Sequence, residues 1–403
     1  NRALFSIFTH NYARRAIYIN VLTSVRSLGT NELTIVDSLS HTDRCYLTYR
    51  DDLLNEHKGS YFGQIKAKLP RLDEYPEHKS RNSAVLAFLA DSIKDSINEL
   101  KQKYSKDRIA IILGTSTSGL DETENELKKF MQTGVPSRDF YYKSQEFGDP
   151  SMFLADYLDI DGPAYTISTA CSSSARALIC GKRMLESGLV DAVIAGGADT
   201  LCKVPINGFN SMGVLSHERC LPFNKNRAGI NIGEGGGLMI LSKEKASLEL
   251  LGVGESSDAY HVSSPEPSGA GAISAMKMAL DDASLTTDDI GYVNLHGTAT
   301  KLNDAMESKA MASLFKGKVP CSSTKYMTGH TLGAAGIVEA AILCYLLKHD
   351  LDLPVQDFSH DEIDDTLDEC GLVKEKMKAK KKVMMSNSFA FGGNNASIII
   401  ANA

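Results

Sequence analysis

The chain has 403 residues, 43% of them hydrophobic, which is enough to bury a large core in two domains or in one duplicated unit. Its formal charge of −7 gives no global indication of nucleic acid or of an anionic membrane as a partner. The eight cysteines are scattered, without a C-x-x-C pair or a metal-like cluster. We therefore expect no metal site, no disulfide framework and a reducing, cytoplasmic compartment.

Neither a membrane-spanning segment nor a signal peptide is expected. A membrane span needs roughly 18 apolar residues, and the strongest candidate, residues 336–347, is shorter and carries Glu339. Residues 1–20 contain Arg14 and Arg15 in their middle and no uninterrupted apolar core, which argues against a signal peptide.

Apolar runs and helical spacing alternate along the first part of the chain. The expected strands are residues 16–21, 108–113, 165–167, 191–195 and 238–241. The expected helices are residues 84–104 and 172–186. Residues 22–79 are polar and mixed, and they give no clear pattern beyond a turn after the first strand.

Strands and helices are also expected to alternate in the second part of the chain. The expected strands are residues 250–255, 291–295, 320–324, 383–387 and 396–400, and the expected helices are residues 271–283, 303–315 and 332–348. The alternation of the two element types predicts α/β layers with mainly parallel strands. Two similar successions suggest an internal duplication, with one half at residues 1–245 and the other at residues 246–403.

Cys171 lies at the joint between the strand at residues 165–167 and the helix that follows. Unpaired backbone N–H groups and the positive end of the helix dipole favour a thiolate there, so we expect a pKa below the value of about 8.5 for a free thiol. Such a thiol is a nucleophile. A small buried hydrophobic residue is the equally open alternative.

Two further motifs contain histidines. His296 follows the strand at residues 291–295 in the run His-Gly-Thr, where small residues leave room for a ligand. Lys325 and His330 flank a glycine turn that precedes a helix rich in Gly and Ala. A structural histidine and an ordinary surface lysine stay open as alternatives in both motifs.

The loop at residues 389–395 places Phe389 and Phe391 beside Gly392 and Gly393, between two apolar strands. This pattern is typical of a tight hairpin with packed aromatic residues. A Gly-rich loop also presents backbone N–H groups to an oxyanion.

Together and in this order, the four motifs resemble the β-ketoacyl-[acyl carrier protein] synthases of the elongating, Cys-His-His group. The resemblance covers the chain from about residue 16 to residue 401 and is weakest before residue 80. It implies a thiolase-like fold, in which two similar halves form a five-layered αβαβα sandwich that is normally dimeric. It also implies an active site between the halves, with Cys171 from the first half and both histidines from the second.

The resemblance assigns a role to each motif residue. Cys171 would take the acyl chain as a thioester, and the backbone N–H groups of Cys171 and Phe391 would form the oxyanion hole. His296 and His330 would donate hydrogen bonds to the enolate formed when malonyl carrier loses CO₂, with Lys325 positioning His330. The remaining assignments are the phosphopantetheine-binding Thr298 and Thr300, the substrate-pocket residues Thr117 and Phe389, the gate at Phe391 with Gly392 and Gly393, and the supporting polar residues Asp304 and Glu307.

Three segments narrow the resemblance. Residues 198–202, 207–210 and 229–234 look most like the ketosynthases of aryl-polyene clusters, which implies a growing conjugated acyl chain. The polar Thr117 likewise suggests a chain that is not plainly saturated. The family usually has Gly where Ala299 and Ala390 stand and Thr where Asn394 stands, and the extra methyl groups would stiffen both loops.

The implied partners are an acyl carrier protein and a second thiolase-like chain, either a copy of this chain or a chain-length-factor-like subunit that lacks the cysteine. No cofactor is expected on this chain, since 4'-phosphopantetheine on the carrier holds the substrates. Carrier proteins are acidic and need a basic face, for which the candidates are Lys66, Lys68 and Arg71, or Lys225 with Arg227. The run at residues 374–382 is more basic, and a solvated charge run is the favoured interpretation there.

Rival functions make different sequence predictions. A thiolase would need a second cysteine in the loop at residues 389–395, and a starter-type synthase would have Asn in place of His330. A non-catalytic partner subunit of a ketosynthase heterodimer is the alternative from another class. Nucleotide binding is disfavoured, because the glycines at residues 233–237 lead into a strand rather than into a helix.

Overall fold

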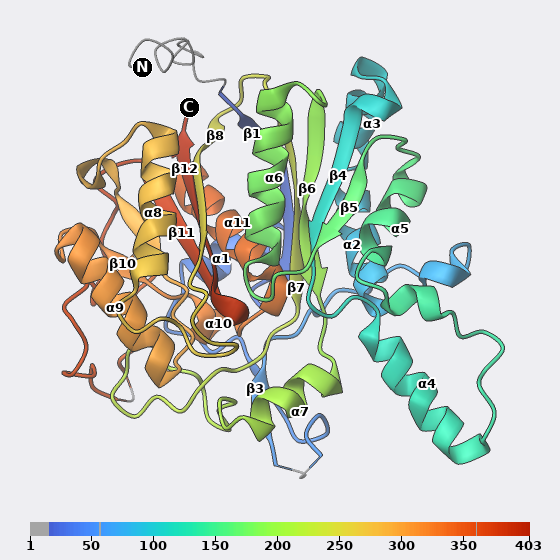
Figure 1. Ribbon diagram of the computed structural model, residues 1–403, viewed down its shortest axis with the longest axis horizontal. Coiled ribbons are helices and arrows are strands. Elements are labelled where there is room, and N and C mark those ends of the chain that lie inside the picture. The colour runs from blue at the N-terminus through green and yellow to red at the C-terminus, as the bar shows by residue number, and fades with distance from the viewer. Residues whose placement is uncertain (1–15, 56–57, 360) are drawn as a thin grey trace, which may run out of the picture.

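A computed structural model describes residues 16–55, 58–359 and 361–403 (Figure 1). Most of the segment tested for a signal peptide, residues 1–15, lies outside the described residues. One large sheet has ten strands in the order β10-β9-β11-β12-β8-β1-β7-β6-β4-β5. A small second sheet pairs β2 (Thr48–Arg50) with β3 (Ser60–Phe62).

The large sheet divides into two sets of strands at the contact between β1 and β8. We call these sets the first sheet and the second sheet. The first set is β1 (Tyr18–Arg26), β4 (Ile109–Gly114), β5 (Ala164–Ile167), β6 (Ala192–Asp199) and β7 (Gly235–Ser242). The second set is β8 (Leu248–Ser257), β9 (Tyr292–Asn294), β10 (Cys321–Ser322), β11 (Val383–Ala390) and β12 (Asn394–Asn402). Only two residues of β1, Tyr18 and Ile19, pair with β8.

The two sets have the same topology. When the strands of each set are numbered along the chain, both sets have the order 3-2-4-5-1, and both combine two parallel with two antiparallel pairings. The prediction of mainly parallel strands is therefore wrong. The last strands of each set, β7 and β12, run antiparallel to their neighbours, which requires no helical crossover. The repeated order supports a duplication, whose boundary near residue 245 stays a prediction.

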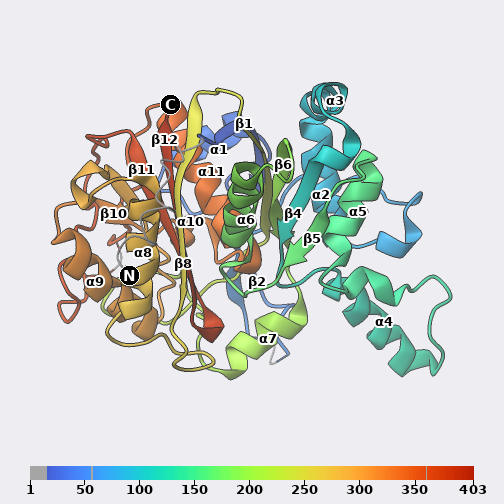
Figure 2. The same ribbon diagram turned by 45° about the horizontal axis from the view of Figure 1, so that its top comes forward.

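Helices complete the five layers that Figures 1 and 2 show. The outer helices α2 (Arg81–Ser92) and α5 (Asp149–Leu158) cover the first sheet, and α8 (Ala270–Ala283) and α9 (Lys301–Phe315) lie on the far side of the second. Between the sheets lie α6 (Ser173–Ser187) and α11 (Ala335–Lys348), which contact each other. The remaining helices are α1 (Glu32–Leu39), α3 (Lys94–Lys103), α4 (Leu120–Thr133), α7 (Lys203–Ser211) and α10 (Lys325–Thr328).

The strand sequences explain the layers. Ala110 and Ile112 of β4 pack into the central core between the sheets, while Ile109, Ile111 and Leu113 pack against the outer helices. This alternation is the period of two that sends successive side chains to opposite faces. Both faces are apolar because helices cover both, as in buried sheets generally.

Helix α11 is buried on every side, from Ala335 to Leu347, because it lies between two sheets. Its sequence, apolar on all sides except at Glu339, is therefore that of a core helix. Among the described residues, none of the helices combines the length and apolarity that crossing a membrane requires.

Some element boundaries differ from the sequence predictions. The helix expected at residues 84–104 is interrupted at Ile93, which leaves the helical conformation with φ −124° and ψ 22°. The unassigned region contains α1, whose Asn31 and Thr34 form a capping box in which Thr replaces the usual acidic residue. The long helix expected from residue 332 begins at Ala335, because Leu332 has a positive φ of 50°.

Candidate active site

Cys171 lies just before α6, as the sequence predicts. The preceding Ala170 has a φ of 51°, so the chain turns sharply and presents the sulfur at the helix end. The end of β4 approaches the same helix closely at Gly114, where an added Cβ would lie 2.2 Å from the backbone nitrogen of Ser174. Glycine is therefore required there to let the strand and the helix meet.

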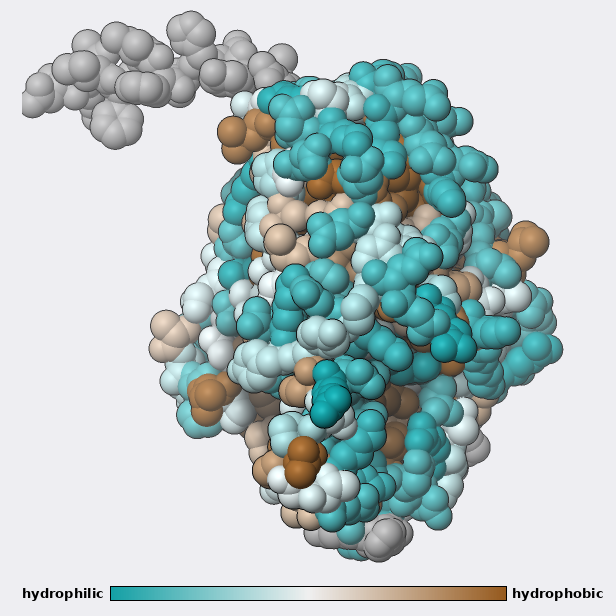
Figure 3. Space-filling view, turned by 90° about the vertical axis from the view of Figure 1, so that its right-hand side faces the viewer, coloured by the Kyte–Doolittle hydropathy of each residue, from teal (hydrophilic) through white to brown (hydrophobic). Residues whose placement is uncertain are grey.

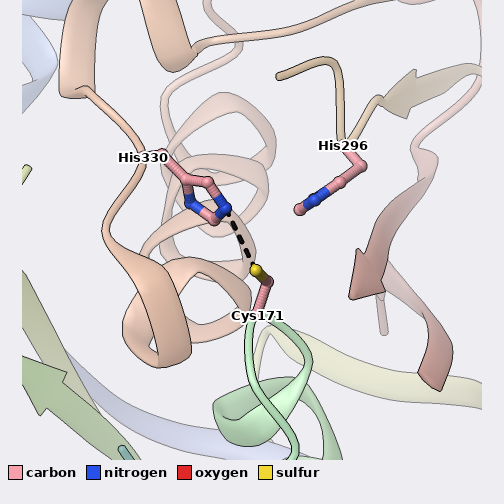
Figure 4. A group of neighbouring side chains, drawn as sticks. All are labelled: Cys171, His296 and His330. Atoms are coloured by element: carbon pink, nitrogen blue, oxygen red, sulfur yellow. Dashed lines mark hydrogen bonds between the residues drawn. The ribbon is translucent and has the colours of Figure 1, made fainter. Parts of the chain in front are cut away.

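Both predicted histidines converge on the sulfur from the second half of the chain (Figure 4). Nε2 of His330 lies 3.1 Å from Sγ of Cys171. The rings of His296 and His330 are 5.3 Å apart at 84°, and one side-chain atom of each of the three residues lies within 4.8 Å of the others. The three side chains are buried and face one another.

The backbone fixes the protonation of His330. The N–H of Leu332 donates to Nδ1 of His330 at 3.3 Å, so Nδ1 is the acceptor nitrogen of the neutral ring. The proton therefore lies on Nε2, which faces Cys171. This ring is placed to donate a hydrogen bond into the site.

Lys325 fixes His296 in the same tautomer. Its Nζ lies 3.4 Å from Nδ1 and 2.5 Å from the carbonyl oxygen of His296, and it pairs with Glu339 at 2.5 Å. A lysine only donates, so Nδ1 of His296 accepts and Nε2 carries the proton. The expectation that Lys325 positions His330 is thus corrected: from the first residue of α10 its side chain turns to α11 and to the loop after β9.

Burial determines the charge state of the three central residues. It raises the pKa of the Cys171 thiol to about 11, against the opposing effects of the Lys325 charge and of hydrogen bonds from backbone N–H groups. This shift is opposite to the predicted low thiol pKa, because the loss of water around the sulfur outweighs the Lys325 charge and the two backbone N–H groups. Burial also lowers the pKa of His296 and His330 well below the usual 6.5, so both rings are neutral at neutral pH.

The backbone around the sulfur provides two donors. The N–H groups of Phe391 and of Cys171 itself are directed at the Cys171 sulfur. Gly392 and Gly393 have φ values of 79° and 72°, which turns the loop after β11, and the N–H of Gly392 donates instead to the carbonyl of Val262. The Phe391 amide is therefore the N–H group of this loop that is directed at the reacting sulfur.

A cavity of about 590 Å³ leads to Cys171. Its lining includes His296, His330, Thr298, Thr300, Phe389 and Phe391, all of which the sequence analysis selected. The side chain of Phe391 packs on Phe209 of α7, with ring centroids 5.7 Å apart. Sequence reasoning missed Phe209 as a site residue, and only its segment, 207–210, was selected.

Asp304 and Glu307 lie behind the cavity rather than in its lining. Glu307 accepts from the backbone N–H groups of His296 and Gly297, both at 2.7 Å, and thereby holds the loop that carries His296. Burial raises its pKa to about 7. Asp304 accepts from the N–H of Phe223 at 2.9 Å and pairs with Arg227 at 3.3 Å.

Thr117 does not line this cavity. Its hydroxyl donates at 2.7 Å to Asp199, the buried last residue of β6, which also accepts from Thr115 at 2.6 Å and from the N–H of Ala334 at 3.1 Å. A buried carboxylate needs such donors, and this one takes the hydroxyl that we expected to face the substrate. Sequence reasoning missed Asp199 as a site residue, although an acid that ends an apolar strand is a signal.

The chain was compared with known proteins. Residues 88–246 match the description Beta-ketoacyl synthase, N-terminal domain, and residues 248–359 match Beta-ketoacyl synthase, C-terminal domain. The 3-oxoacyl-[acyl-carrier-protein] synthase 2 of Vibrio cholerae is 33% identical over 329 residues, which cover 76% of this chain and 79% of that protein.

Solved structures of ketosynthases support the same family. The ketosynthase ApeO, in complex with its chain length factor ApeC from Xenorhabdus doucetiae, is 47% identical with a TM-score of 0.94, over 98% of this chain and 100% of that one. The ishigamide ketosynthase/chain length factor is 25% identical with a TM-score of 0.87, over 97% and 100% of the two chains. The expected thiolase-like fold is confirmed, and the chain belongs to the β-ketoacyl synthase family.

Proposed function

We propose that this chain is a catalytically active ketosynthase, which joins malonyl carrier to an acyl chain held on Cys171 by decarboxylative Claisen condensation. The observation that carries the proposal is the convergence of two Nε2–H donors, from His296 and His330, on one buried sulfur at the end of a cavity. A non-catalytic partner subunit would have no use for this arrangement.

The first half-reaction is acyl transfer. The sulfur of Cys171 attacks the thioester carbonyl of the acyl carrier, and the developing oxyanion is stabilised by the N–H groups of Cys171 and Phe391. Each such donor contributes about 3 kcal/mol in other acyl-transfer enzymes. The bond to the carrier sulfur breaks, and the thiol proton passes to that leaving sulfur.

The second half-reaction forms the new carbon–carbon bond. Malonyl carrier loses CO₂, and the enolate oxygen accepts hydrogen bonds from Nε2–H of His296 and of His330. The enolate carbon then attacks the acyl thioester on Cys171, which breaks the bond between the acyl carbon and the Cys171 sulfur and releases the β-ketoacyl carrier. The thiolate that leaves takes up a proton from water and becomes the thiol again. Because both rings are neutral, they act here as donors, while Lys325 supplies the nearby positive charge.

We propose that the carrier inserts its phosphopantetheine arm through the cavity, past Thr298 and Thr300. Of the basic candidates, Lys66, Lys68, Arg71 and Lys225 are exposed, whereas Arg227 is 6% exposed and pairs with Asp364. Arg227 is therefore a structural residue at the cavity wall rather than a docking cation. A cytoplasmic location belongs to the same proposal.

The acyl chain and the partner are proposed from the similarity to ApeO. We infer a conjugated polyene chain and a heterodimer with a chain-length-factor-like subunit. Two features support a partner on the side seen in Figure 3, where brown side chains stand among teal ones: β5 is an edge strand, and α4 exposes apolar residues. Leu127, Phe130 and Met131 of α4 are 55%, 44% and 86% exposed.

Mass spectrometry tests the enzymatic proposal. Incubation with acyl carrier should add the acyl mass to Cys171, and malonyl carrier should then remove it with release of CO₂ and β-ketoacyl carrier. Cys171→Ala is the control and should give neither product. An unmodified Cys171 with no CO₂ release in the parental protein would favour the non-catalytic subunit.

Co-expression tests the partner. Met131→Glu should weaken a heterodimer with a chain-length-factor-like chain in size-exclusion chromatography with light scattering. Met278→Glu, at an exposed position of α8, is the matched control and should leave assembly unchanged. Assembly with a second copy alone would support the homodimer instead.

A further inference from the structure

Arg26, the last residue of β1, is buried against helix α11 of the central layer. Its side chain is among the largest that are fully buried, at 1% exposure. Nη1 donates to the carbonyl oxygen of Val338 at 3.1 Å and lies 3.4 Å from the hydroxyl of Ser24. Nε and Nη2 have no hydrogen-bond partner among the described residues. An uncompensated buried guanidinium is costly, so its presence needs an explanation.

Helix α11, which packs next to Arg26, carries a buried carboxylate whose charge is opposite to that of the guanidinium. Val338, whose carbonyl oxygen accepts the hydrogen bond from Arg26, precedes Glu339 in α11. The side chain of Glu339 is also buried. One oxygen of Glu339 pairs with Lys325, while the other, Oε2, has no hydrogen-bond partner among the described residues. Lys325 is therefore the ion-pair partner of this buried carboxylate, and Arg26 is anchored on the residue that precedes it in α11.

The charges of these residues depend on one another. Burial raises the pKa of Glu339, and the positive charges of Lys325 and Arg26 oppose that shift. Tyr345, whose ring centroid lies 5.9 Å from the guanidinium carbon, is the other titratable group facing Arg26. With Glu339 ionised, Lys325 keeps its ion pair and stays directed at His296.

We propose that Arg26 is a positioning residue for the condensation reaction. Its charge keeps Glu339 ionised, Glu339 holds the ammonium of Lys325 against Nδ1 of His296, and His296 therefore presents Nε2–H to the enolate oxygen. Arg26 does not line the cavity, and it acts through its charge on Glu339 and through its hydrogen bond to the Val338 carbonyl. The inference rests on the proposed function, because it concerns the decarboxylation step.

A pair of substitutions separates the charge of Arg26 from its hydrogen bond. Arg26→Gln keeps a donor for the Val338 carbonyl but removes the charge, whereas Arg26→Lys keeps the charge. We expect Arg26→Gln to lower kcat for malonyl-carrier decarboxylation about tenfold and Arg26→Lys to restore most of it. KM for malonyl carrier and acylation of Cys171 should change less than about twofold, since neither uses His296 as a donor.

Nitrogen NMR of ¹⁵N-histidine-labelled protein gives a readout independent of activity. The parental protein should show His296 protonated on Nε2, and Arg26→Gln should shift it toward the Nδ1 tautomer. Tyr345→Phe, which loses only the contact of its hydroxyl with Ser24, is the matched control for disturbing this part of the core and should leave the tautomer unchanged.

The outcomes are distinct. A folded Arg26→Gln variant with the parental decarboxylation rate and tautomer would overturn the proposal. Equal losses in Arg26→Gln, Arg26→Lys and Tyr345→Phe, accompanied by a lower Tm, would overturn it in favour of a purely structural role. A parental protein that does not decarboxylate malonyl carrier would contradict the proposed function, while the tautomer measurement would still test the contacts of Arg26.

Discussion

Cys171 and His330 are 159 residues apart in the chain, yet Nε2 of His330 lies 3.1 Å from Sγ of Cys171. The N–H of Leu332 makes this ring a donor toward the sulfur rather than a base that removes its proton. The contact therefore connects the nucleophile of one half-reaction with an enolate-binding donor of the other.

Replacing His330 should separate the two half-reactions. We expect His330→Ala to slow malonyl-carrier decarboxylation about 100-fold, because the enolate loses one of its two side-chain donors. Acylation should be affected less, since its oxyanion is bound by backbone N–H groups. His330→Asn retains an N–H donor and should decarboxylate faster than His330→Ala. Measured CO₂ release at the parental rate in His330→Ala would contradict the assigned role.

The alkylation rate of Cys171 should depend strongly on pH. Burial raises the pKa of this thiol to about 11, so only a small thiolate fraction exists at neutral pH, and that fraction grows as pH rises. The rate constant with iodoacetamide should increase about tenfold per pH unit between pH 7 and 10. Peptide mass spectrometry in a Cys45→Ser background, which lacks the exposed thiol, measures it. A plateau below pH 8 would instead indicate a lowered pKa.

Thr117 should matter for stability and not for substrate choice. Thr117→Val keeps the shape of the side chain but removes a donor from buried Asp199, which should cost about 1–2 kcal/mol of unfolding free energy. The preference among a panel of acyl carriers should stay parental, because Thr117 does not line the cavity. A changed acyl preference at an unchanged Tm would support the original pocket assignment.

Glu307 should make stability depend on pH. Its pKa rises from 4.5 to about 7 on folding, so between these values the folded state binds a proton that the unfolded state has released. The contribution of Glu307 to stability is thus fully present below about pH 4.5 and falls by about 3 kcal/mol as pH rises through 7. Glu307→Gln should remove this slope, as chemical unfolding at pH 5 and pH 8 will show. An identical pH slope in the variant would exclude Glu307 as its source.

The sequence was sufficient for the local features of the site. Cys171 follows a short strand and precedes an amphipathic helix, His296 follows a strand, and His330 precedes a helix, so periodicity and the motifs place each at an element end. Residues 383–400 likewise read as a strand pair. These features depend on neighbours within a few residues, which a single sequence contains.

The features of the site that could not be predicted from the sequence depend on packing between distant segments. The thiol pKa was predicted in the wrong direction, because the burial of Cys171 depends on the second half of the chain. The partner of Lys325 was predicted as the nearby His330, whereas the fold brings His296 to it. Arg26 and Glu339 gave no functional signal, since 312 residues separate Arg26 from the Val338 carbonyl that it contacts.

The shared strand order of the two sheets has a consequence for the site. Cys171 follows β5, the third strand of its set, and His330 follows β10, the third strand of the other. Helix α6 follows the first of these strands and α11 follows the second after the short helix α10, and the two long helices contact each other in the central layer. The hydrogen bond between Cys171 and His330 thus joins the segment after the third strand of one set to the segment after the third strand of the other. One set contributes the sulfur and the other the imidazole, so neither set holds a complete reaction centre by itself.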